Sequence, residues 1–341
     1  MKSRLTGRGV PWRTPAAFTL VELTVSVALL TFLMIILANM TDSASRAWSQ
    51  GQSRTDTFQT ARASLDLLAR ELAPAAVDTR MQFVVAPASV LPPSLISSQN
   101  IAGDSPVLLW VAPLGNDGSL CCVGYYLYRD DANQFHRLQR LHIPATDANG
   151  NPAPYFPQTA NLNNPRDMSL QPSPTDASWF TRNWTSGTAG SPFSDPTVVS
   201  TAADGVIAFW AQCIDSLGNP IPPVSGSTIH PASPLSFNSA AYFQAATTLP
   251  FDNGSSFTYL AQTAQSLRAN RVPAAIDLTI MLLDGATIAR SGTLPQQVSA
   301  AAADGTINVA QSVSDLNNKL NRAGVYNART FSTRVKLING N

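Results

Sequence analysis

Charged side chains are scarce in this chain. They make up 13% of its 341 residues, and the formal net charge is only +1. Globular domains usually hold about a quarter charged residues. Non-specific binding to nucleic acid scales with the number of phosphates that Lys and Arg neutralise, so no nucleic-acid partner is expected here. The hydrophobic share of 44% is enough to build a core, which excludes a highly charged disordered chain.

Cysteine and histidine are also rare, with three of each. Cys121 and Cys122 are adjacent, and Cys213 lies far along the chain. On the oxidising side of a membrane one of the pair could bond Cys213 and leave the other free; plain buried thiols are the alternative. No C-x-x-C pair occurs, and His136 and His142 lack nearby Cys or carboxylate ligands in the sequence. No metal site is therefore predicted.

Catalytic signatures are missing as well. The sequence holds no G-x-S-x-G, P-loop or H-E-x-x-H motif, and the spacing of its Ser, His and Asp residues singles out no triad. The acidic turn at 147–151 lacks the twelve-residue calcium pattern with its terminal Glu, so a solvated turn is predicted. We expect no enzyme and no cofactor; a membrane-anchored enzyme, the alternative, would need a polar cleft holding a perturbed acid or base.

One long apolar run, by contrast, lies near the N-terminus. It covers residues 18–40 and holds a single charge, Glu22. A helix of this length can cross a hydrocarbon core of about 30 Å. Basic residues and no acidic one precede the run: Lys2, Arg4, Arg8 and Arg13. This bias predicts a single pass through the inner membrane with the N-terminus in the cytoplasm. The alternative is a secretory signal peptide, but no small-x-small cleavage site follows the run.

Glu22 needs an explanation, because an ionisable side chain at membrane depth usually has a function. It lies near one end of the run and could also reach the membrane interface. The segment Ala17-Phe18-Thr19-Leu20-Val21-Glu22 resembles the processing site of type IV prepilins and type II secretion pseudopilins. The resemblance implies that prepilin peptidase cuts between Ala17 and Phe18 and methylates Phe18. Ala17 departs from the family pattern, in which Gly precedes the cut, but it is also small.

The same resemblance implies a role for Glu22 in assembly. In a filament, the new N-terminal ammonium of a subunit is buried among apolar helices, and a carboxylate on a neighbouring helix can neutralise it. Burial of either charge without the other would be costly, so the pair would set the register between subunits. The implied partners are prepilin peptidase, other pilins or pseudopilins of the filament, and inner-membrane lipid.

A single long helix is predicted to follow the leader. No proline lies between Pro15 and Pro74, and the only glycine is Gly51, so the helix should run from residue 18 to about residue 72. Its second half carries one mostly apolar face at three- and four-residue steps, which should pack on a globular domain. The face consists of Trp48, Gly51, Thr55, Phe58, Ala61, Leu65, Leu68 and Leu72. A stalk or coiled coil is the alternative, although the stripe is short for heptads.

After Pro74 the apolar pattern alternates, which predicts strands. The segments are 81–85, 107–111, 123–128, 135–143, 205–214, 275–283 and 330–338, and the third and fourth should form a hairpin. In 275–283 the alternation indicates one buried face and one less buried face. Short helices are predicted at 255–270 and at 313–323, the latter closed by Gly324.

More than half of the 25 prolines lie between Pro144 and Pro234, which predicts long irregular insertions at about 144–200 and 218–250. The expected fold class is α+β and pilin-like, with one long N-terminal helix packed on antiparallel sheets. The expected divisions are a leader at 1–17, a transmembrane half-helix at 18–40, an amphipathic half-helix at 41–73 and a β-rich domain at 74–341.

Short pieces beyond residue 40 extend the resemblance. The helix end RASLDLLARELAPA and the hairpin VGYYLYRDDANQFHRLQRL are similar to the J-type minor pseudopilin of type II secretion, as are the segments GVIAFWAQCIDSLGNPI and RVPAAIDLTIMLLDG. The large size and the segment TDSASRAW are similar to Verru_Chthon cassette protein C. The implied function is a structural minor pilin or pseudopilin. The alternative is a surface adhesin or DNA-uptake pilin whose insertions bind a ligand.

Overall fold

The computed structural model describes the chain from Thr19 onward, with gaps. The described residues are 19–77, 82–88, 105–115, 118–130, 135–147, 191–221, 237–239, 246–250, 256–260, 273–284, 309–322, 324–325 and 328–338, with the single positions 91, 95, 101, 150, 151, 153, 155, 156, 180, 184 and 287. The chain divides into two compact units, residues 1–52 and residues 53–341.

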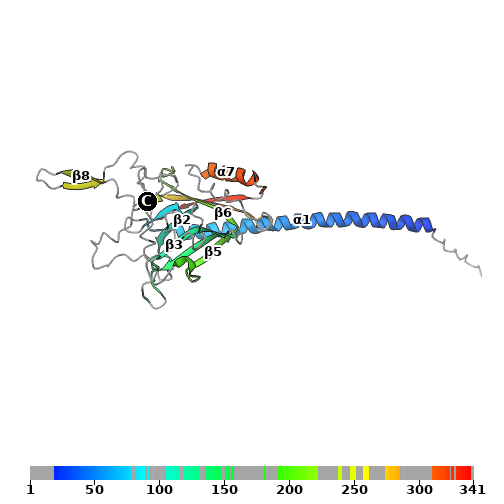
Figure 1. Cartoon of the computed structure of the whole chain (residues 1–341), viewed down its shortest axis with the longest axis horizontal. Coiled ribbons are helices and arrows are strands. Elements are labelled where there is room, and N and C mark those ends of the chain that lie inside the picture. The colour runs from blue at the N-terminus through cyan, green and yellow to red at the C-terminus, as the bar shows by residue number, and fades with distance from the viewer. Residues whose placement is uncertain are drawn as a thin grey trace, which may run out of the picture. The chain divides into compact units, whose positions relative to one another are not determined.

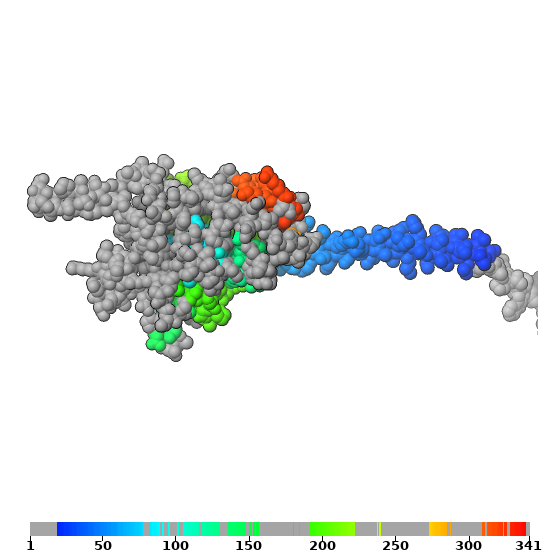
Figure 2. Space-filling model, in the orientation of Figure 1, coloured from blue at the N-terminus to red at the C-terminus, as the bar shows by residue number. Residues whose placement is uncertain are grey.

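Helix α1, Leu20–Leu72, is one unbroken helix of 53 residues, as the absence of proline predicted (Figure 1). It contributes to both units. Every residue from Thr19 to Gln52 is exposed in the isolated chain, including the large apolar side chains of the first half (Figure 2). By length and composition α1 could span a membrane near its N-terminus. The molecule is therefore α+β, with a long apolar N-terminal helix and antiparallel sheets.

The larger sheet has the strand order β5-β4-β3-β2-β1-β7, and all its neighbours are antiparallel. Its strands are β1 Val84–Pro87, β2 Pro106–Ala112, β3 Cys121–Asp130, β4 Phe135–Pro144, β5 Val199–Asp204 and β7 Phe237–Asn238. β3 and β4 form the predicted hairpin, in which Tyr125 lies opposite Arg140. β5 and β7 were not predicted, since β5 has little apolar alternation and β7 is only two residues long.

A second sheet has the order β11-β10-β6 and is also antiparallel. It consists of β6 Val206–Ile214, β10 Ala275–Leu282 and β11 Arg329–Lys336. Helix α7, Val309–Arg322, packs on one of its faces through Leu316 and Leu320, and Gly324 follows α7 with φ of +80°. That angle is in the left-handed region that glycine tolerates at helix ends. The predicted helix at 313–323 is thus confirmed, with four more residues at its start.

The main core lies where α1 meets both sheets. Ala61, Leu65, Leu68 and Leu72 of α1 are buried against inward-facing residues of β2, β3, β6 and β10. The predicted packing face is therefore correct from Ala61 onward and wrong before it. Trp48 is 79% exposed and Phe58 is 57% exposed. Residues that precede Ser53 belong to the other compact unit, whose described residues are those of α1 and Thr19 before it.

The prediction of a less buried face on the strand at 275–283 was wrong for most of its length. Ile276, Leu278 and Ile280 face the main core, as expected, but Met281 on the other face is fully buried. Met281 is buried because α7 packs over that end of the sheet. Trp210 of β6 belongs to the same apolar cluster. Of the residues on that face, Asp277 is half buried, as the alternation indicated, whereas Thr279 is buried.

The helix predicted at 255–270 was wrong at its start. Residues Ser256–Leu260 form strand β9, which pairs with β8, Ala246–Pro250, in a separate antiparallel hairpin. Aromatic and β-branched residues dominate the segment SFTYL, and they favour a strand over a helix. The rest of that predicted helix lies outside the described residues.

The insertion at 144–200 is not irregular throughout. Its described residues include five that are buried on the outer face of the larger sheet: Ala153, Tyr155, Phe180, Trp184 and Phe193. The Trp184 indole N–H donates to the Tyr155 carbonyl over 2.9 Å, and the Trp184 and Phe193 rings meet edge to face at 5.4 Å. Aromatic residues from the insertion thus form a second core, which protects a sheet face that water would otherwise contact.

We predict that Leu68→Ala destabilises the domain strongly, by about 3 kcal/mol, because it leaves a cavity at a fully buried site in the main core. Leu217→Ala is the matched control, since Leu217 is 72% exposed, and should change stability by less than about 0.5 kcal/mol. Urea unfolding of the full chain in detergent, followed by tryptophan fluorescence, measures both. Equal effects would contradict the assignment of this face of α1 to the core.

Candidate functional site

The predicted processing and assembly residues lie at the start of α1. Ala17 and Phe18 are outside the described residues, which begin at Thr19. Glu22 lies in the first turn of the helix and is fully exposed in the isolated chain. It is the only charged residue in the described chain before Asp42, and its neighbours Leu20, Val21 and Leu23 are 60–80% exposed.

Thr19 and Glu22 cap the helix reciprocally. The Thr19 backbone N–H and hydroxyl both donate to Glu22 Oε2 over 3.0 Å, and the Glu22 backbone N–H donates to Thr19 Oγ1 over 3.3 Å. This is the capping box, in which a Thr at the helix start and a Glu three residues later each satisfy a backbone donor that the helix leaves unpaired. The box was not predicted from the sequence, although the T-x-x-E spacing is its signal.

The geometry leaves half of the Glu22 carboxylate available. Both donors from Thr19 reach Oε2, and no described group donates to Oε1. A carboxylate oxygen can accept more than one hydrogen bond, so a cation from outside the chain could be bound at Oε1 while the cap stays intact. The helix N-terminus also favours a negative charge at this position.

A second polar cluster joins the end of α1 to the larger sheet. Glu71, the last residue but one of α1, accepts a hydrogen bond from the Tyr125 hydroxyl over 2.7 Å at Oε2. Arg140 Nε donates to the same oxygen over 2.9 Å, and Arg140 Nη2 forms an ion pair with Oε1. The Trp110 indole N–H donates to the Glu71 carbonyl over 3.2 Å, and its ring stacks on Tyr125 at 5.8 Å.

The two charged side chains of this cluster are largely buried. The Glu71 side chain is 8% exposed and that of Arg140 is 21% exposed. Burial raises the pKa of the Tyr125 hydroxyl, and the negative charge of Glu71 raises it further, so the hydroxyl stays protonated and donates. Burial lowers the pKa of Arg140, but its hydrogen bonds and charge attraction to Glu71 outweigh this and raise the pKa overall. The cluster thus fixes α1 on the sheet as an ion pair.

Glu71 was not predicted from the sequence. The signal was available, because Glu71 lies beside Leu68 and Leu72 on a face predicted to be apolar, and a charge there needs a partner of opposite sign. Arg140, on the predicted strand at 135–143, is that partner.

The possible disulfide is absent. Cys121, Cys122 and Cys213 are free, buried thiols. Cys213 belongs to the main core, whereas Cys122 faces the second core on the outer side of the larger sheet, so the sheet itself separates them. Burial raises the pKa of both thiols, and the neighbouring Cys121 adds to the effect at Cys122. Such thiols are poor nucleophiles.

The two histidines of β4 belong to no group of potential metal ligands among the described residues. His136 is buried and His142 is half buried, and within the described residues no group of three or more His, Cys, Asp or Glu side chains could bind a metal ion. Burial, and then the positive charge of Arg140, lower the pKa of His142, which favours its neutral form. The acidic turn at Asp147 is closed by hydrogen bonds with Asn151.

Comparison with known proteins found no match, either among protein-family models or among curated proteins. The functional inference therefore depends on the chemistry of Thr19, Glu22 and the exposed apolar half of α1.

We predict that Glu71→Gln lowers the free energy of unfolding by about 3 kcal/mol, because it leaves Arg140 partly buried without its counter-ion. The matched control is Asp66→Asn on the same helix. Asp66 pairs with Arg62 at 3.7 Å, and both side chains are over 70% exposed, so this change should cost less than about 0.5 kcal/mol. Urea unfolding of both variants would contradict the anchoring role if the two losses were alike.

Proposed function

We propose that this chain is a minor pilin or pseudopilin, a structural subunit of a type II secretion pseudopilus or a type IV pilus. Prepilin peptidase removes residues 1–17 and methylates Phe18. The subunit waits in the inner membrane with its N-terminus in the cytoplasm and its β-rich domain in the periplasm. It then enters a filament through α1. In this proposal the chain is the substrate of an enzyme and has no catalytic role of its own.

The observation that carries the proposal is the single carboxylate of Glu22 in an otherwise apolar, fully exposed half-helix. An apolar helix surface of this length is stable only in lipid or against other apolar helices. A membrane anchor alone needs no acid at this depth, and an acid there is costly. A second role for the helix explains both features, because a helix that leaves lipid for a helical bundle can use a charge to find its register.

The capping box gives this role a structural basis. While the subunit is in lipid, Thr19 satisfies Glu22 Oε2 and so reduces the cost of the charge. Glu22 Oε1, which has no donor among the described residues, can then accept the ammonium of Phe18 from a neighbouring subunit. The cap and the contact between subunits use different oxygens, so the helix start need not unwind during assembly.

The sequence around the cut also supports the proposal. Phe18 and Glu22 match the motif in order and spacing, with a basic leader in front, and Ala17 is a small residue where the motif has Gly. The J-type pseudopilin resemblance of the hairpin and helix end favours type II secretion over a pilus.

We predict that coexpression with a prepilin peptidase yields a mature chain that begins at Phe18 and carries one added methyl group at its N-terminus. Intact-mass and N-terminal peptide mass spectrometry measure both features, with cells that lack the peptidase as the control. A chain that still begins at Met1 in the presence of peptidase, or one cut after residue 40, would refute the proposal.

We predict that Glu22→Ala leaves cleavage largely intact but impairs methylation of Phe18 or filament assembly, because the neighbouring ammonium loses its counter-ion. Ser26→Ala is the matched control in the same half-helix, since the Ser26 hydroxyl bonds only the Glu22 carbonyl, at 2.7 Å. Sheared-filament yield and the mass of the N-terminal peptide separate assembly from processing. Filaments from Glu22→Ala in normal amount would rule out charge pairing.

A further inference from the structure

The outer edge of β11 pairs with no strand among the residues that the structure describes. β11 is the edge strand of its sheet, and its ladder with β10 runs from Ala275↔Lys336 to Leu282↔Arg329 without a register shift. It has eight residues and contains no proline or glycine. A long, regular edge of this kind can pair with another strand, because its outward backbone groups have no partner within the sheet.

The hydrogen bonds at the end of β11 identify which groups face outward. The Leu337 N–H donates to the Ala274 carbonyl over 2.9 Å, so Leu337 is directed toward the β10 side. Directions alternate along an antiparallel strand, so alternate residues from Thr330 to Lys336 direct their N–H and C=O groups away from β10. The Ile338 N–H, next in this outward series, donates to the Ala73 carbonyl of the segment after α1. None of the four strand residues before it bonds a described residue through these groups.

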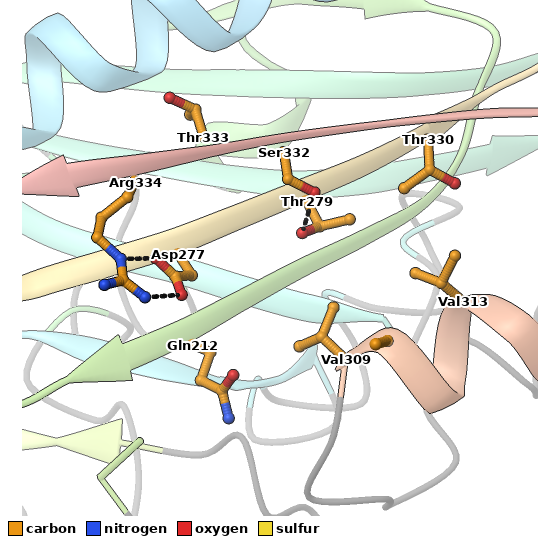
Figure 3. A pocket seen from close by; sticks show the side chains of 10 residues that line it. Gln212, Asp277, Thr279, Val309, Val313, Thr330, Ser332, Thr333 and Arg334 are labelled. Carbon is orange, nitrogen blue, oxygen red and sulfur yellow. Dashed lines mark hydrogen bonds and ion pairs between the residues drawn. The ribbon is translucent and has the colours of Figure 1, made fainter. Parts of the chain in front are cut away.

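These outward residues share a face with a cavity of about 530 Å³. Thr330, Ser332 and Arg334 line the cavity, together with Asp277 and Thr279 of β10 (Figure 3). Val309 and Val313 from the start of α7 form its apolar side. A strand added to β11 would therefore place alternate side chains beside this cavity.

The charge of the edge indicates what kind of strand it would accept. β11 carries Arg329, Arg334 and Lys336 and no acidic residue. Arg334 is held by Asp277 through two hydrogen bonds of 2.6 and 2.7 Å, whereas Arg329 and Lys336 are exposed and have no acidic partner among the described residues. An incoming strand with acidic side chains complements this edge, and a basic one is repelled.

Strand β5, at one edge of the larger sheet, shows how this protein closes an edge. β5 has six residues, its pairing with β4 shifts register between Leu138 and Gln139, and its one charge, Asp204, is paired with Arg137 at 2.9 Å. Short length and bulges are devices that prevent strand addition. β11 has neither device. Cations on an edge strand can also deter pairing, but only with strands that carry no acidic groups.

We propose that the open edge of β11 binds an extended, acidic segment of another polypeptide by strand addition, with backbone hydrogen bonds to Thr330, Ser332, Arg334 and Lys336. The backbone supplies affinity, and Lys336 with the adjacent cavity selects the side chains. This binding role is separate from the processing and assembly of α1, and its test involves neither cleavage nor filaments.

The test uses the full chain in detergent micelles and a fluorescent nine-residue peptide of alternating threonine and glutamate, with anisotropy as the readout. We expect saturable binding with a Kd below about 1 mM. N-methylation of alternate peptide residues, which removes the backbone donors on one edge, should weaken binding at least about tenfold, as should replacement of glutamate by lysine. Lys336→Glu should weaken binding of the acidic peptide by about tenfold.

Ser332→Pro and Ser332→Ala form the matched pair of variants. Both lose the 2.9 Å hydrogen bond between the Ser332 and Thr279 hydroxyls, but only proline removes the outward N–H. Ser332→Pro should abolish binding, and Ser332→Ala should bind within about twofold of the parent chain.

The proposal would be overturned by the absence of saturable binding, by equal binding of the N-methylated peptide, or by equal binding to the two Ser332 variants. The proposal would also be overturned if an oligothymidylate of the same charge competed as effectively as the unlabelled peptide. The edge would then be a general polyanion surface. If Ser332→Pro fails to fold, as judged by circular dichroism, the N-methylated peptide decides the matter alone.

Discussion

The fold depends on one helix whose two halves suit different surroundings. The first half of α1 is mostly apolar and exposed in the isolated chain, whereas the second half buries only the face from Ala61 to Leu72. Neither half is stable in the other's surroundings, because an all-round apolar surface is unfavourable in water and a charged face is unfavourable in lipid. The lack of proline and the single glycine keep the two halves in one continuous element.

Each half of α1 holds one carboxylate in largely apolar surroundings, and hydrogen bonds stabilise its charge. At the start of α1, Thr19 donates twice to Glu22; at its end, Tyr125 and Arg140 donate to Glu71. The two solutions differ in completeness. Both Glu71 oxygens have partners from the sheet, so the contact is a permanent anchor, whereas Glu22 keeps one oxygen without a donor among the described residues. A carboxylate oxygen that has no donor among the described residues is suited to a partner from another chain.

Much of the fold could be predicted from the sequence, because the apolar patterns that define α1, the β3–β4 hairpin, β6, β10, β11 and α7 are local. The parts that failed depend on distant segments. Met281 is buried only because α7 packs over it. Strand β9 follows the β propensity of SFTYL, although a helix was predicted there. The Glu71 cluster joins the end of α1 to β2 and to the β3–β4 hairpin, at sequence separations of 39 to 69 residues, and the position of Cys122 depends on which side of a sheet it faces. Nothing in the spacing of these residues alone gives that information.

The wrongly predicted part of the helix face is itself informative. Trp48 and Phe58 follow the same three- and four-residue spacing as Leu65 and Leu72, yet they remain mostly exposed. Of the two, only Phe58 has a ring partner among the described residues, Phe331 at 5.6 Å. A sequence pattern reports which residues avoid water, and it does not distinguish a contact within a chain from a contact between chains. Trp48 lies well past the apolar run, where lipid tails do not reach. In the proposed filament, helices of neighbouring subunits would cover it, so the stripe is best understood as one continuous apolar face shared between the core of this subunit and the surface it offers to the next.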